Sequence, residues 1–391
     1  MAKGQVKKIR LAYASLVDRV FGDGSAVFDT VADISNNVIG AIAHPTQFDA
    51  FKSNFEARLL RLRVAADRDP ALRTEILGAV NRVASREWDG AYAELCALDY
   101  FLAGWEMEPG TVVLDRTVRS SETLASEMGM TDANHDLSFT KLGVSADTKV
   151  LSDKSGQILE GIFKSYRGAK KIQALSILPE YDPAADYSQF SDNRADLLKE
   201  LIDNVDPDLR PRHLKSKVIE GLSYSFGWDP GVQFACSTYC PREHAKQQHR
   251  LLFQHAKKFS RNEASVIVFV IFPWFSQKVY QFKDATQTFL KEFADNFFHG
   301  YIGSSIPVLD FNAKFKSSIS VEDVTRHLSG VVYLQDSTIY PCNLDELGIE
   351  ASYAWNPNAR HLLKGHEFEA RLNRKGAFDL STFDPERKSE R

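Results

Sequence analysis

An unbroken apolar run, Val266-Ile-Val-Phe-Val-Ile-Phe272, constrains the fold of this chain more than any other feature. A strand with one solvent-exposed face alternates apolar and polar residues, so a continuous apolar, β-branched run is typical of a strand buried on both faces. The run is too short to cross a bilayer. We therefore expect an α/β fold in which this run is a central strand of a mixed sheet flanked by helices.

Composition narrows the class of protein. The chain has 391 residues, of which 43% are apolar and 26% charged, which is typical of a globular protein with two or three domains. Its four cysteines do not suggest a disulfide scaffold, so a cytoplasmic location is expected, with no membrane partner. Because the net charge is −4, any nucleic-acid binding must come from local basic clusters.

Helical and β-like patterns divide the chain into three parts. Residues 1–85 have apolar residues at helical spacing and are expected to form an N-terminal helical region. Residues 86–275 are expected to form the core, with an inserted lobe at about 153–238, and residues 276–391 a C-terminal α/β extension. Within the core, the pattern predicts helices over 88–102 and 241–259.

The main candidate site residues lie on two short β-like runs, residues 135–140 and 144–151. Gly143 allows a turn between them, which would fold the runs as a hairpin. Side chains alternate along a strand, so Asp147 and Lys149 share one face, and the hairpin brings Asp136 beside them. Two carboxylates and the Thr148 carbonyl are hard oxygen ligands, which suit Mg²⁺ or Mn²⁺, and Lys149 would assist a metal-bound water.

Glu94 is the third candidate acid. It lies on the predicted helix over 88–102, on a face shared with apolar residues, where a carboxylate is costly unless it is paired or bound to metal. The alternative is an ion pair with a nearby arginine or lysine. Two further alternatives remain open: Asp147 and Lys149 as the solvated face of an edge strand, and Asp132, in a turn-like segment, as the first acid.

The order of these segments resembles the PD-(D/E)xK nuclease-like superfamily, whose fold is shared by many restriction and repair nucleases. The resemblance covers residues 86–152 and 240–275 and rests on Glu94, Asp136 and Asp147-Thr148-Lys149. It implies a mixed sheet of the restriction-endonuclease-like type. It also implies Asp136, Asp147, Thr148 and Glu94 as the metal site, and Glu94, Asp136, Asp147 and Lys149 as the catalytic residues.

The predicted helix over 241–259 is strongly basic. Five of its residues are expected to bind nucleic acid: Arg242, Lys246, Arg250, Gln254 and Lys257. The alternative is an amphipathic helix whose wet face is basic. Smaller basic clusters at 164–171 and 210–217 indicate a substrate channel in the inserted lobe, where Tyr166 and His213 would stack on bases.

Other chemistries fit the sequence less well. Structural zinc bound by Cys236, Cys240, His244 and His249 is disfavoured by the spacing of these residues. The chain lacks a phosphate-binding loop of the P-loop type, a dinucleotide-binding glycine motif and a nucleophile elbow.

The sequence therefore predicts a metal-dependent endonuclease that hydrolyses phosphodiester bonds, with double-stranded DNA as the expected substrate. A non-catalytic nucleic-acid- or protein-binding module on the same fold is the alternative. Cleavage of both strands would favour a homodimer or a partner subunit.

Overall fold

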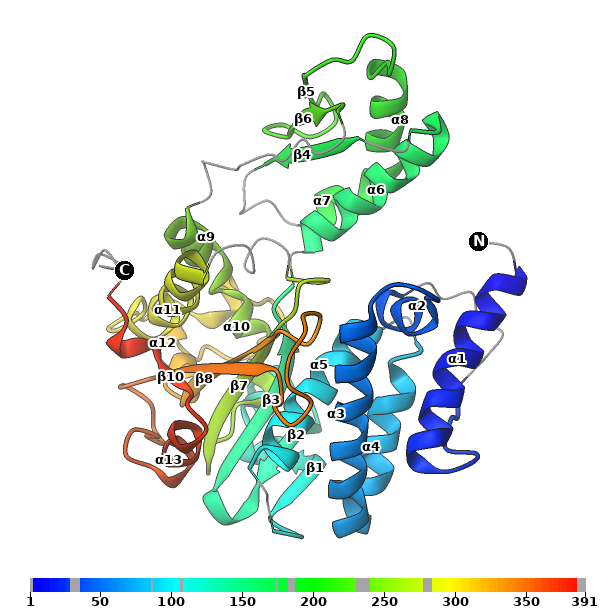
Figure 1. The fold of residues 1–391 in the computed structure, drawn as a ribbon. Coiled ribbons are helices and arrows are strands. Elements are labelled where there is room, and N and C mark those ends of the chain that lie inside the picture. The colour runs from blue at the N-terminus through cyan, green and yellow to red at the C-terminus, as the bar shows by residue number, and fades with distance from the viewer. Residues whose placement is uncertain are drawn as a thin grey trace.

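The computed structural model describes residues 3–28, 36–85, 87–105, 108–152, 154–172, 175–181, 187–229, 240–276 and 283–384. These residues form a central sheet with helices on both faces and a lobe that projects from one end of the sheet (Figure 1). The expected α/β class with a mixed central sheet is confirmed. Within the described residues, no helix combines the length and apolar character needed to cross a membrane.

The central sheet has seven strands in the order β1-β2-β3-β7-β8-β9-β10. Strands β1, β2 and β3 form an antiparallel meander, β7 and β8 run parallel to β3, and β9 is antiparallel to β8. The short β10 is parallel to β9. Their bounds are β1 Val112–Arg119, β2 Asp132–Phe139, β3 Val144–Val150, β7 Ala264–Ile271, β8 Gly330–Asp336, β9 Ile349–Trp355 and β10 Phe378–Asp379.

Strand β7 lies at the middle of this sheet and is buried at every position, as the apolar run predicts. Val266, Val268 and Val270 contribute to the core on one face. Ile267 and Phe269 contribute to the core on the other face. Alternate side chains of one strand thus join the sheet to two helical layers.

The first helical layer is built mostly from the N-terminal part of the chain (Figure 1). It contains α1 (Lys3–Phe21), α2 (Asn37–Ala43), α3 (Asp49–Arg68), α4 (Pro70–Arg82) and α5 (Trp88–Leu98). Pro70 occupies the first turn of α4, where its missing N–H is not needed, and the Asp69 side chain caps that turn. α5 continues into one π-helical turn, Asp99–Ala103, so the predicted helix over 88–102 is present.

The second layer covers the opposite face and comes from later segments. It contains α9 (Pro241–Gln248), α10 (Leu251–Gln254), α11 (Lys283–His299) and α12 (Val321–Thr325), while α13 (Glu367–Arg374) packs Phe368 against the first core. The prediction of one continuous helix over 241–259 is wrong. The His249 side chain is hydrogen-bonded to the Lys246 carbonyl, in competition with the helical backbone, and the chain breaks there. After α10 it forms a 3₁₀ turn, Ala256–Lys258.

The lobe follows β3 directly and has its own core (Figure 1). It contains α6 (Lys154–Lys170), α7 (Tyr187–Asp192) and α8 (Arg194–Asn204), packed on the small antiparallel sheet β4-β6-β5. The strands are β4 Ser176–Glu180, β5 His213–Lys215 and β6 Ser223–Gly227. Tyr166 is buried and donates a hydrogen bond to the Val205 carbonyl, so the expectation that it stacks on bases is wrong. His213 is exposed on β5.

Candidate functional site

The candidate site lies where β2 and β3 separate. Their backbone pairing ends at Leu137 opposite Ala146, and the next positions are Asp136 and Asp147. Beyond this point, among the described strands, β2 continues beside β1 and β3 continues beside β7. The Thr148 N–H donates instead to Asp136 Oδ2, at 2.7 Å. Residues at facing positions share one side of a sheet, so both carboxylates point to the same face.

Lys149 joins these two acids. Its Nζ lies 2.6 Å from Asp147 Oδ2 and 3.7 Å from Asp136 Oδ2. The same ammonium donates a hydrogen bond to the Thr148 carbonyl, at 2.9 Å. The structure therefore brings together four of the residues proposed from the sequence, on two neighbouring strands.

A second lysine, Lys258, completes the cluster and was missed by sequence reasoning. Its Nζ lies 2.8 Å from Asp136 Oδ1 and also contacts Asp147 Oδ1, so one ammonium bridges both carboxylates. Lys258 ends the 3₁₀ turn after α10, and its carbonyl lies 2.9 Å from His135 Nε2. Sequence reasoning chose Lys257 because it assumed a continuous helix. The signal was the adjacent Lys257-Lys258 pair, which alone could not show which ammonium faces the strands.

Burial and charge set the protonation of this cluster. Burial and the neighbouring Asp136 carboxylate raise the pKa of Asp147, whose side chain is only 3% exposed, although both lysines oppose the rise. Burial also disfavours the charged form of Asp136, but Lys149 and Lys258 outweigh it and lower its pKa. Lys258 is affected in the opposite sense: burial disfavours its charge, but the two aspartates raise its pKa. The arrangement favours one firmly ionised acid beside one whose ionisation depends on a nearby cation.

Glu94 borders the site without joining the cluster. It lines a cavity of about 30 Å³ together with Asp136 and Thr148. Its carboxylate accepts a hydrogen bond from Arg82 at the end of α4, which is the ion-pair alternative considered for this residue. Burial raises the pKa of Glu94, and Arg82 opposes the rise.

Asp115 on β1 lines the same cavity and has an unusual backbone. It stands opposite Asp136, between the Leu114–Leu137 and Arg116–His135 pairs, with φ at 48°. This left-handed conformation is uncommon outside glycine, although aspartate adopts it more readily than most residues. The rival acid Asp132 is different: it starts β2 and is exposed, so its prediction as part of a turn is wrong.

The residues proposed to bind nucleic acid are distributed along α9, α10 and the 3₁₀ turn that follows. Arg242 lies 3.5 Å from Glu292 of α11, and the Arg250 guanidinium stacks over the Phe311 ring, 4.8 Å from its centre. Lys246 and Gln254 are exposed, and Lys257 is half-buried. It is the neighbouring Lys258 whose ammonium contacts both aspartates.

The cluster has the donors to hold a cation. The Asp136 and Asp147 carboxylates and the Thr148 carbonyl all contact positively charged nitrogen already. These are hard oxygen donors, as Mg²⁺ and Mn²⁺ prefer. Glu94 does not complete a trio, because among the described residues no three His, Cys, Asp or Glu side chains lie close enough to share an ion.

The zinc alternative finds no support in the same region. Cys236 lies outside the described residues, and Cys240 is exposed with a free thiol. His244 packs on Phe289, and both ring nitrogens of His249 make hydrogen bonds, to the Lys246 carbonyl and the Tyr301 hydroxyl.

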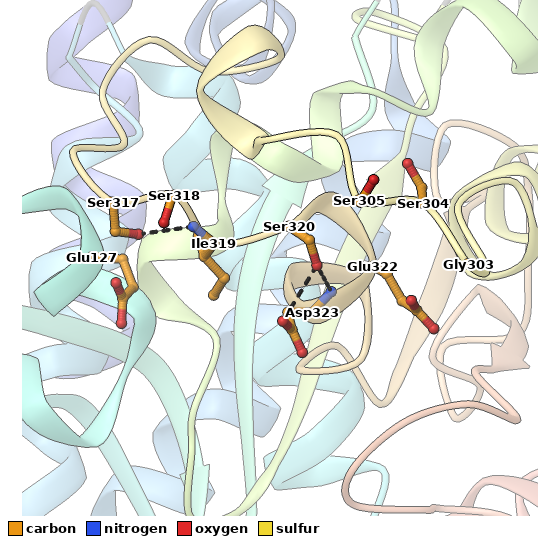
Figure 2. A pocket seen from close by; sticks show the side chains of 10 residues that line it. All are labelled: Glu127, Gly303, Ser304, Ser305, Ser317, Ser318, Ile319, Ser320, Glu322 and Asp323. Atoms are coloured by element: carbon orange, nitrogen blue, oxygen red, sulfur yellow. Dashed lines mark hydrogen bonds between the residues drawn. The ribbon is translucent and has the colours of Figure 1, made fainter.

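A larger surface hollow of about 580 Å³ is lined by neither Asp136 nor Asp147 (Figure 2). Three of its polar groups already have local structural roles. Ser317 accepts from the Ile319 N–H, Ser320 caps α12, and Glu127 pairs with Arg261. The remaining lining is mainly Ser304, Ser305, Ser318, Glu322 and Asp323. This open groove carries no arrangement comparable with the lysine–aspartate cluster.

Comparison with known proteins adds no further constraint. No protein-family model, no curated protein and no solved structure matches this chain.

Proposed function

We propose that this protein is a metal-dependent endonuclease that hydrolyses phosphodiester bonds, with double-stranded DNA as its substrate. One observation carries the proposal: the Asp136 and Asp147 carboxylates meet around a single cationic position, with the Lys149 ammonium beside it. Carboxylate oxygens that converge on one cation, next to a second positive group, suit hydrolysis of a charged phosphodiester.

The order of the elements supports the restriction-endonuclease-like assignment. The helix with Glu94 is followed by the β1-β2-β3 meander, which carries Asp136 and Asp147-Thr148-Lys149. The helical segment α9–α10 and then β7 follow, after an inserted lobe. This is the order of the PD-(D/E)xK nuclease-like core that the sequence resembles.

The residues of the site would have different roles in the reaction. Asp136, Asp147 and the Thr148 carbonyl would hold Mg²⁺ or Mn²⁺, which when bound supplies a water of lowered pKa and charge to offset that of the phosphate. Lys149 lies against the Thr148 carbonyl and Asp147, where its ammonium can orient the water and stabilise charge that develops on the phosphate. Glu94 would act from the adjacent cavity, through water, rather than as a direct ligand.

Cleavage of supercoiled plasmid tests the proposal. Purified protein is incubated with Mg²⁺ or Mn²⁺, with and without EDTA, and the nicked form is quantified on a gel. We expect chelator-sensitive nicking that falls at least about 100-fold in Lys149→Ala and Asp147→Ala. Lys141→Ala is the matched control, since Lys141 is exposed and pairs with Glu108. Nicking that both site variants retain would refute the assignment.

A second candidate function has one specific observation in its favour. Each aspartate is already neutralised by lysine ammonium groups, as in a structural ion-pair network. A non-catalytic nucleic-acid-binding module on the same fold would keep such a cluster without metal. It predicts binding of duplex DNA at low salt, with no nicking and no effect of the Asp147→Ala substitution on that binding.

A further inference from the structure

We propose that Lys258 occupies the cation position of the free protein, and that DNA phosphate draws it away so that DNA binding tightens metal binding. This inference rests on the proposed nuclease function and adds a regulation of the same site. Lys258 is the one residue of the cluster that comes from the second helical layer, whereas Asp136, Asp147 and Lys149 belong to the sheet.

The charge balance of the cluster leads to this inference. Asp136 and Asp147 contribute two negative charges when both are ionised, and Lys149 and Lys258 contribute two positive charges. A divalent cation added to this buried group would leave two uncompensated positive charges. Its repulsion from the lysines would be only weakly screened, because the cluster is largely withdrawn from water. Metal binding to the free protein is therefore opposed by the ammonium groups already present.

Geometry identifies Lys258 as the main competitor. Its Nζ contacts one oxygen of each aspartate, so it takes the bridging position that a metal ion would need. Lys149 lies closer to Asp147 than to Asp136 and also donates to the Thr148 carbonyl, which fixes it along β3. The Lys258 backbone is fixed by His135, but its stem is long and flexible, so the ammonium can swing while the turn stays in place.

A nearby phosphate would offer Lys258 another partner. An ammonium that transfers to a phosphate oxygen leaves both aspartates free, and the phosphate also compensates the charge of the incoming metal. By linkage, DNA must raise the affinity for metal by the same factor as metal raises the affinity for DNA. The free protein would then bind Mn²⁺ weakly and the DNA complex tightly.

The test measures Mn²⁺ affinity directly, through the spectrum of free Mn²⁺ in electron paramagnetic resonance titrations. Wild-type protein is compared with Lys258→Met, and Lys141→Met is the control, because Lys141 is an exposed lysine that pairs with Glu108. We expect Lys258→Met to bind Mn²⁺ at least tenfold more tightly than wild type, and Lys141→Met to be unchanged. Equal or weaker binding by Lys258→Met would overturn the inference.

A second measurement needs no variant. Mn²⁺ affinity of the wild-type protein is measured with and without a short DNA duplex, after subtraction of Mn²⁺ bound by DNA alone. We expect the duplex to tighten binding at least tenfold, and to do so less in Lys258→Met. An unchanged wild-type affinity, together with Mg²⁺-dependent plasmid nicking, would remove the inference and leave the nuclease assignment intact. No Mn²⁺ binding by any form, with no nicking, would remove both.

Discussion

The buried charges around Arg58 give a sharp prediction about what attaches the N-terminal helices to the sheet. Arg58 of α3 has a fully buried side chain. Its Nε lies 3.1 Å from Asp99 Oδ2, beyond the end of α5, and its Nη2 lies 2.9 Å from Asp336 Oδ2 at the end of β8. Its guanidinium also lies over the Tyr92 ring. We predict that Arg58→Met strongly lowers the free energy of unfolding.

The magnitude follows from what remains after the substitution. Removing one partner of a buried ion pair typically costs about 3–5 kcal/mol, since the other charge stays buried. Here Asp99 keeps two hydrogen bonds from Arg61, and Asp336 keeps those from the Tyr92 hydroxyl and Thr338. These remaining donors place the expected loss near the lower end, at about 3 kcal/mol.

Equilibrium urea unfolding, followed by tryptophan fluorescence, measures this loss through the midpoint at an unchanged slope. Arg63→Met is the matched control, because Arg63 lies on the same helix but its pair with Asp67 is half-exposed. That control should change the free energy of unfolding by less than about 1 kcal/mol. A loss below about 1 kcal/mol in Arg58→Met would contradict the reasoning.

Two further predictions concern stability at acid pH and the space around two glycine residues. Burial lowers the pKa of His327 to about 4, so between that pH and the ordinary value the unfolded chain binds a proton that the native protein does not. The free energy of unfolding therefore decreases as the pH is lowered through this range. Between pH 7 and pH 5, measured by urea titration, His327→Gln should lose about 1–2 kcal/mol less of this free energy than wild type; equal losses would contradict this. Gly330→Ala should destabilise by about 2–3 kcal/mol or more, because its Cβ would overlap the Trp355 ring and lie 2.9 Å from the Ala354 carbonyl oxygen. Gly168→Ala, in open space on α6, should instead stabilise the protein by about 0.5–1 kcal/mol. If both glycine substitutions shifted the thermal unfolding temperature in the same direction, the packing argument would be refuted.

The central sheet and the acidic half of the site could be predicted from local patterns. The run around Val268 indicates a strand buried on both faces, because burial on both sides removes the need for alternation. The β2–β3 hairpin could be predicted for a similar reason: Gly143 supplies a positive φ of 60° between two alternating segments. Once the hairpin forms, period-two geometry places Asp136 beside Asp147.

The rest of the site depends on contacts distant in sequence. Lys258 reaches Asp136 across more than a hundred residues, and its direction depends on the break after α9, where the His249 side chain is hydrogen-bonded to the Lys246 carbonyl. No local pattern predicts that Glu94 pairs with Arg82, since both residues have other neighbours at helical spacing. Tyr166 illustrates the same limit: it is buried in the core of the lobe, and its hydroxyl donates to the Val205 carbonyl, 39 residues further along the chain.

The most direct measurement of the central claim compares two aspartates of one strand. DNA cleavage in Mg²⁺ is measured under single-turnover conditions for wild type, Asp136→Asn and Asp132→Asn. Asp136 contacts Lys258 and Lys149, whereas Asp132 is an exposed residue at the start of the same strand. We predict that Asp136→Asn abolishes EDTA-sensitive cleavage and that Asp132→Asn retains it. Cleavage that survives Asp136→Asn, or wild-type protein that never cleaves DNA with Mg²⁺ or Mn²⁺, would contradict the account.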